Sequence, residues 1–201
     1  MVLDWIHHGA MLFFGHVGLQ TRSCYAWGIP EHFLALQSRF AFAEAVWLNQ
    51  QDLHRKLAHA PKDQRNKYLC CADRTCLPAH GKLFGETVVL YGDPACEARL
   101  LSATDPLYDQ TIHVEKLADG KARATFEVTM RRARRPSRPA AFILREPLGS
   151  VAQTIEGPKA LVVADNFALI PFWPSGAPTP KVGQQFHATV LLQGNAAGAT
   201  N

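Results

Sequence analysis

The sequence predicts an α+β fold in which a long amphipathic helix near the N-terminus packs on a mostly antiparallel β-sheet or small barrel. Residues 31 to about 59 contain no Gly or Pro and repeat apolar side chains at helical spacing. Beyond residue 99, short apolar or alternating runs are separated by Gly and Pro, which is typical of strands and turns. With 201 residues, of which 47% are hydrophobic, the chain can bury a full core.

The predicted helix begins after Gly28 and ends at Pro61. Pro30 suits its first turn, because the missing N–H of proline costs no hydrogen bond there. Glu31 places a negative charge at the positive end of the helix dipole. The apolar face is formed by Phe33, Leu36, Phe40, Ala43 and Trp47.

The clearest strand signal is a β-hairpin formed by residues 111–117 and 122–130 around a turn at 118–121. Its second strand alternates apolar and polar residues, which predicts one face in the core and one face in water. Shorter apolar runs bounded by turn formers predict the remaining strands, at residues 87–91, 141–145, 161–164, 168–172 and 185–193.

We expect the chain to form one compact unit made of three segments. These are a helical region at 1–60, a cysteine-rich segment with the first strand at 61–98, and a β-rich region at 99–201. Asp4 and three histidines interrupt the apolar opening, which argues against a signal peptide and against a membrane span. The protein is therefore expected to be cytoplasmic, with no membrane partner.

The cysteine-rich segment is a candidate structural zinc site. Zinc needs four thiolate or imidazole ligands, often presented in pairs by short spacers. The four candidate ligands are Cys71, Cys76, His80 and Cys96. Their spacing is wider than usual, so a second interpretation stays open, in which the thiols are small buried hydrophobic groups.

The most concentrated charge feature is an arginine run that directly follows the predicted hairpin. The chain carries a net charge of +4, and residues 130–139 contain five arginines and no acidic residue. Guanidinium groups bind phosphate oxygens in a bidentate manner, so this run predicts contacts to a nucleic-acid backbone. The alternative is a solvated loop that pairs with acidic protein surface. The candidate phosphate-binding residues are Arg131, Arg132, Arg134, Arg135 and Arg138.

Catalytic motifs are not evident in the sequence. It contains no Gly-rich phosphate loop, no G-x-S-x-G nucleophile turn and no His-Glu-x-x-His helix. Nine histidines and five cysteines leave open a small enzyme that uses a Cys or His side chain. On balance we do not expect an enzyme.

Residues 24–57 resemble the N-terminal segment of type V CRISPR effectors and their transposon-encoded RNA-guided relatives. The shared pattern is an aromatic-x-x-Gly-x-Pro turn, here Tyr25 to Pro30, followed by a long helix that carries Trp47 and Asn49. In those families this segment belongs to a domain that grips guide RNA and duplex. The resemblance implies nucleic-acid binding without cleavage, in CRISPR-like defence.

These features together predict a non-catalytic subunit that binds RNA or DNA within a larger ribonucleoprotein or DNA-processing complex. The expected partners are nucleic acid and other protein subunits. A protein–protein adaptor or structural subunit is the main alternative, and a small Cys/His enzyme is the second.

Overall fold

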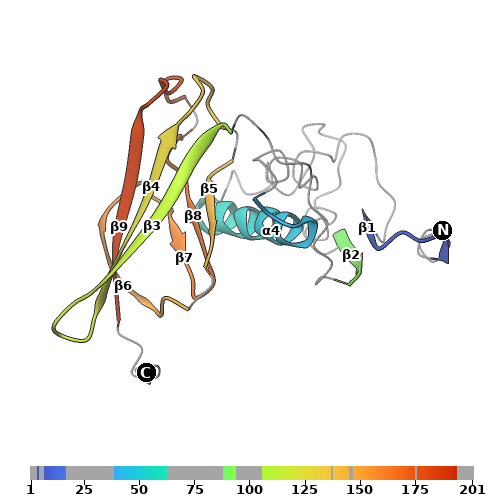
Figure 1. The fold of residues 1–201 in the computed structure, drawn as a ribbon, viewed down its shortest axis with the longest axis horizontal. Helices are drawn as coiled ribbons and strands as arrows, with labels where there is room; N and C mark the ends of the chain where they lie inside the picture. The colour runs from blue at the N-terminus through green and yellow to red at the C-terminus, as the bar shows by residue number, and fades with distance from the viewer. Residues whose placement is uncertain are drawn as a thin grey trace. The chain divides into compact units, whose positions relative to one another are not determined.

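The computed structural model describes residue 4 and residues 7–16, 39–62, 88–93, 106–136, 138–144, 147–174 and 176–193. The chain divides into two compact units, Met1–Ala103 and Thr104–Asn201, and each is described by itself (Figure 1). The described elements are helical and antiparallel β, so the α+β class is confirmed. Three expectations stay predictions: that the chain forms one compact unit, that its segments divide at residues 60 and 98, and that the helix packs on a sheet. No helix in the described ranges is long and apolar enough to cross a membrane.

The helix of the first unit, α4, spans Phe42–His59. Ala41 is extended, and its N–H donates to the Glu44 carboxylate at 2.6 Å, which satisfies a donor at the start of the helix. Residues 39–41 are not helical, so α4 begins at Phe42, later than the predicted start at Glu31. Residues 31–38 lie outside the described ranges. The helix ends at His59, directly before Ala60 and Pro61, as the sequence predicts.

The first unit also contains a two-stranded antiparallel sheet. Strand β1 (Leu12–His16) pairs with β2 (Val88–Gly92), with Leu12 opposite Gly92 and His16 opposite Val88. Strand β2 matches the predicted strand at residues 87–91. Strand β1 was not predicted, because its short apolar run shows no clear alternation.

The second unit is built from two antiparallel sheets that face each other (Figure 1). The first sheet has the order β3-β4-β9-β6, formed by Tyr108–Lys116, Ala122–Met130, Gln185–Leu192 and Val151–Glu156. The second has the order β5-β8-β7, formed by Ala140–Ile143, Phe167–Ile170 and Val162–Val163. The mostly antiparallel sheet is therefore confirmed, in the form of two separate sheets.

The alternation of apolar and polar residues along the strands produces the core of this unit. In β4, the side chains of Ala124, Phe126, Val128 and Met130 are buried, whereas Arg123 and Glu127 are exposed. The Phe126 ring contacts Phe142 of β5 edge to face at 5.1 Å, so the two sheets share one core. Gly157 follows β6 with a φ of +144°, and a Cβ there would lie 2.9 Å from the Cβ of Ala188. Only glycine fits this close approach to β9.

The predicted hairpin is formed by β3 and β4, which pair from Tyr108 opposite Met130 to Lys116 opposite Ala122. In its turn, the Leu117 N–H donates to the Lys121 carbonyl at 2.8 Å. Lys121 also donates hydrogen bonds to the Asp119 carboxylate, and these hold the pKa of Asp119 below its usual value.

Candidate nucleic-acid interface

Residues 131–135, here called the arginine loop, follow β4 at the upper end of the second unit in Figure 1. The N–H groups of Arg131 and Arg132 donate to the Leu107 carbonyl, at 3.0 and 3.3 Å. On the opposite side, Met130 is bonded to the segment that precedes β9, through Gln184 at 2.9 Å and Gly183 at 2.7 Å. The start of the loop is thus anchored to the backbone on both sides.

The side chains of the arginine loop are exposed to solvent. Arg131 forms an ion pair with the partly exposed carboxylate of Asp109. Arg135 donates to the Ala177 carbonyl at 2.8 Å, which directs its side chain along the neighbouring loop. Because exposed ion pairs contribute little energy, Arg131 can exchange Asp109 for another anion at low cost.

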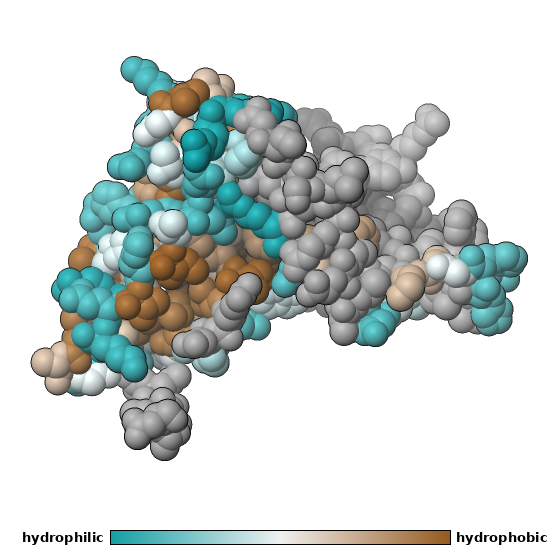
Figure 2. Space-filling model, in the orientation of Figure 1, coloured by the Kyte–Doolittle hydropathy of each residue, from teal (hydrophilic) through white to brown (hydrophobic). Residues whose placement is uncertain are grey.

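A lysine from a distant part of the chain extends this positive surface. Lys181 is exposed in the turn before β9, and this turn is closed by hydrogen bonds between Lys181 and Gln184. The segments 106–112, 130–136 and 176–186 together contain one acidic residue, Asp109, against four arginines and one lysine. Hydrophilic residues predominate at this end of the unit in Figure 2. These described segments therefore carry a net positive charge.

An aromatic cluster lies in the core close to the start of the arginine loop. The Trp173 ring lies 5.5 Å from Tyr108 and 5.8 Å from Phe186, and Phe172 contacts both Trp173 and Phe186. Phe172 and Trp173 are buried, so they support the protein core and are not exposed as stacking platforms for bases.

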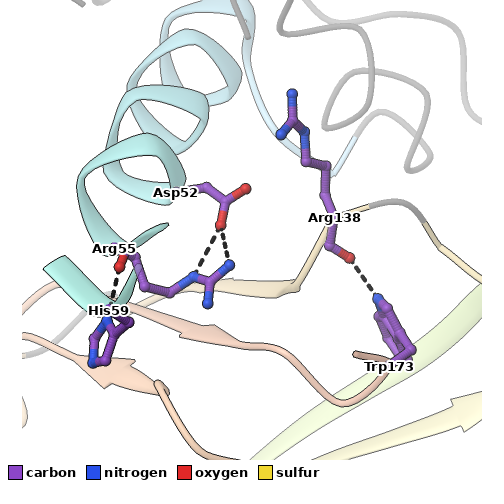
Figure 3. A network of polar contacts seen from close by, with 5 residues as sticks. All are labelled: Asp52, Arg55, His59, Arg138 and Trp173. Atoms are coloured by element: carbon purple, nitrogen blue, oxygen red, sulfur yellow. Dashed lines mark hydrogen bonds and ion pairs between the residues drawn. The ribbon is translucent and has the colours of Figure 1, made fainter. Parts of the chain in front are cut away.

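Arg138 does not belong to the exposed group with which it was predicted. It is 5% exposed, and its backbone carbonyl accepts a 2.6 Å hydrogen bond from the Trp173 indole. Its guanidinium points away from the Trp173 ring (Figure 3). Pro136 and Pro139, on either side of it, are also buried, so the chain enters the protein after the arginine loop. We therefore leave Arg138 out of the candidate interface.

The first unit contains a buried polar group that the sequence interpretation did not identify. On α4, the Nε and one terminal nitrogen of Arg55 donate to the same Asp52 oxygen, at 2.9 and 2.6 Å (Figure 3). Asp52 is 0% exposed and Arg55 is buried. His59 continues the series one turn later, with its Nδ1 2.7 Å from the Arg55 carbonyl. The i, i+3 spacing of the charges was the available signal.

The predicted zinc ligands Cys71, Cys76, His80 and Cys96 all lie outside the described residues. Within the described ranges, no three His, Cys, Asp or Glu side chains gather closely enough to hold a metal ion. The structural zinc site therefore stays a prediction.

Comparison with known proteins gives no match for this chain among protein-family models, curated proteins or solved structures. The resemblance of residues 24–57 to type V CRISPR effectors stays a prediction.

Proposed function

We propose that this chain binds the phosphate backbone of RNA or DNA through the arginine loop, as a non-catalytic subunit of a larger nucleic-acid complex. One observation supports the proposal above all. Four exposed arginines lie within five residues on a loop whose start is bonded to Leu107 on one side and to Gly183 and Gln184 on the other. The described segments that meet there contain one further cation, Lys181, and one acidic residue, Asp109.

Anchoring matters because binding costs less when the cationic groups are already held in place. The backbone bonds from Arg131, Arg132 and Met130 fix the start of the loop, and the Arg135–Ala177 bond orients one guanidinium. Each guanidinium then presents a planar fork that matches phosphate oxygens. Contacts of this kind position a nucleic acid without reading its sequence, so we expect no sequence preference from this loop.

The salt dependence of binding tests this proposal. Each neutralised phosphate on B-form DNA contributes about −0.9 to the slope of log K against log salt, so four contacts predict a slope of about −3.6. This corresponds to an affinity loss of about 150-fold between about 50 mM and about 200 mM salt. Fluorescence anisotropy with a labelled duplex of mixed sequence measures the slope.

Two duplexes of unrelated sequence serve as the control, and they are expected to give the same slope and affinity. No binding at low salt, or binding that does not respond to salt, would contradict the proposal. A stable protein partner that survives nuclease treatment, without any duplex binding, would support the adaptor alternative instead.

A further inference from the structure

The two outer strands of the four-stranded sheet differ in how their free edges are built. Strand β6 has two register shifts against β9, one between Val151 and Gln153 and one between Thr154 and Glu156. Strand β3 pairs with β4 along all of its nine residues without a shift. Within the described part of the chain, no strand pairs with the other side of β3. Bulges protect an edge from pairing with other chains, so β3 is the less protected edge.

The backbone groups of β3 alternate between β4 and the free edge. Leu117 N donates to Lys121 O, and Arg131 N donates to Leu107 O, so the odd-numbered residues of β3 bond to β4. From residue 110 onward, the N–H and C=O groups that point to the free edge therefore belong to Gln110, Ile112, Val114 and Lys116.

Apolar side chains accompany this free edge. Val114 is 51% exposed and Ile112 is half-buried, although both lie on the face of β3 that continues the core face of β4. Apolar residues gather on the side of the second unit shown in Figure 2. A strand added to β3 would shelter both side chains from water.

Strand β3 is complementary to a second copy of itself in one antiparallel register. When His113 lies opposite His113 of the second copy, Ile112 lies opposite Val114, Thr111 opposite Glu115, and Gln110 opposite Lys116. Each apolar residue then meets an apolar one, and no two carboxylates face each other. A register centred on Ile112 would instead place Asp109 opposite Glu115, a like-charge pair.

We propose that two copies of this chain pair through β3, with His113 on the two-fold axis, to form a continuous sheet with four strands from each copy. The open edge of β3, the apolar side chains beside it and the charge pattern along it favour this dimer, whether or not the chain binds nucleic acid.

The dimer would also place two arginine loops where both can contact one duplex, an expectation that rests on the proposed function. Arg131 is bonded beside Leu107, six residues from His113, so the two loops lie about twelve residues apart along the strands. At about 3.4 Å per residue this is roughly 40 Å. One turn of B-form duplex is roughly 34–36 Å, so both loops would contact phosphates about one turn apart.

Sedimentation equilibrium over a concentration series tests the dimer, with a matched pair of variants. Val114→Lys places a charge on the proposed edge, whereas Ile155→Lys places the same charge on β6 at nearly equal exposure, 51% against 50%. Edge pairing alone buries little area, so we expect a reversible, concentration-dependent dimer of the wild type. Val114→Lys is expected to raise its dissociation constant about tenfold or more, and Ile155→Lys to leave it unchanged.

Disulfide cross-linking provides a second test, in which a covalent bond between the two copies is gained and no contact has to be broken. Facing His113 residues form a non-hydrogen-bonded pair with Cα atoms about 4.5 Å apart, within the range for a disulfide. His113→Cys should therefore give a covalent dimer on mild oxidation, whereas Glu115→Cys, displaced along the strand, should not. The oxidised wild type gives the background from its five native cysteines.

Several results would overturn the dimer. These are a monomeric wild type throughout the series, equal effects of the two lysine variants, or no excess of covalent dimer for His113→Cys. A monomer that binds nucleic acid would overturn the dimer and leave the proposed function intact. A dimer that does not bind nucleic acid would overturn the proposed function and leave the dimer intact.

Discussion

Replacing Arg131, Arg132, Arg134 and Arg135 together by glutamine is expected to weaken binding to a labelled duplex about 100-fold at moderate salt. All four side chains are exposed, so the substitutions do not disturb the buried core. The slope of log K against log salt should fall from about −3.6 toward zero, because the counterions released by these four contacts are lost. Fluorescence anisotropy over a salt series measures both changes.

A control variant with the same loss of charge separates the loop from net charge. Two exposed lysines that lie outside both the arginine loop and the β3–β4 hairpin, Lys62 and Lys159, are replaced by glutamate, which removes the same four units of positive charge. This variant is expected to retain most of the affinity and most of the slope. Equal losses in the two variants would show that overall charge drives binding and would contradict a localised interface.

Replacing Asp52 by alanine is expected to lower the free energy of unfolding by about 3–5 kcal/mol. Asp52 is 0% exposed, and its carboxylate accepts two hydrogen bonds from the buried Arg55. Removing one partner of a buried ion pair leaves the other charge poorly compensated in a low-dielectric environment. Urea unfolding followed by far-ultraviolet circular dichroism measures the change, because the pair lies on helix α4.

Two further variants control this experiment. Glu115→Ala removes the carboxylate of the exposed pair with Arg123 and is expected to cost only about 0.2–1 kcal/mol. Asp52→Ala/Arg55→Ala removes both buried charges and should recover part of the loss, because neither charge is then left without its main partner. A cost for Asp52→Ala no larger than that for Glu115→Ala would contradict the structural role of the pair.

The parts of the fold that local patterns determine were predicted well. The hairpin was expected at residues 111–117 and 122–130, and the structure has Tyr108–Lys116 and Ala122–Met130. Apolar and polar residues alternate through its second strand, and the turn residues stand between the two strands. The start of the first strand was placed late because Asp109 and Gln110 are polar.

Features that depend on distant residues were not predicted. Strand β6 was missed because its two bulges and mostly exposed residues remove the alternation that identifies a strand. The helix starts at Phe42, where the Ala41 N–H donates to the Glu44 carboxylate, and apolar spacing does not reveal this capping contact.

The candidate interface was predicted only in part for the same reason. The arginine run is visible in the sequence, but Lys181 joins it only because β4 pairs with β9. Arg138 differs from the rest of the run because the chain turns into the protein at Pro136, and sequence alone gives no sign of that change.

Site-specific photo-crosslinking shows whether nucleic acid binds at the arginine loop. A photoreactive amino acid replaces Ala133, which is exposed in the middle of the loop, or Ala152, which is exposed on the opposite outer strand β6. A labelled duplex is expected to cross-link to the chain modified at residue 133 and much less to the chain modified at residue 152. Cross-linking that is equal at the two positions, or that occurs only at residue 152, would contradict binding at the arginine loop.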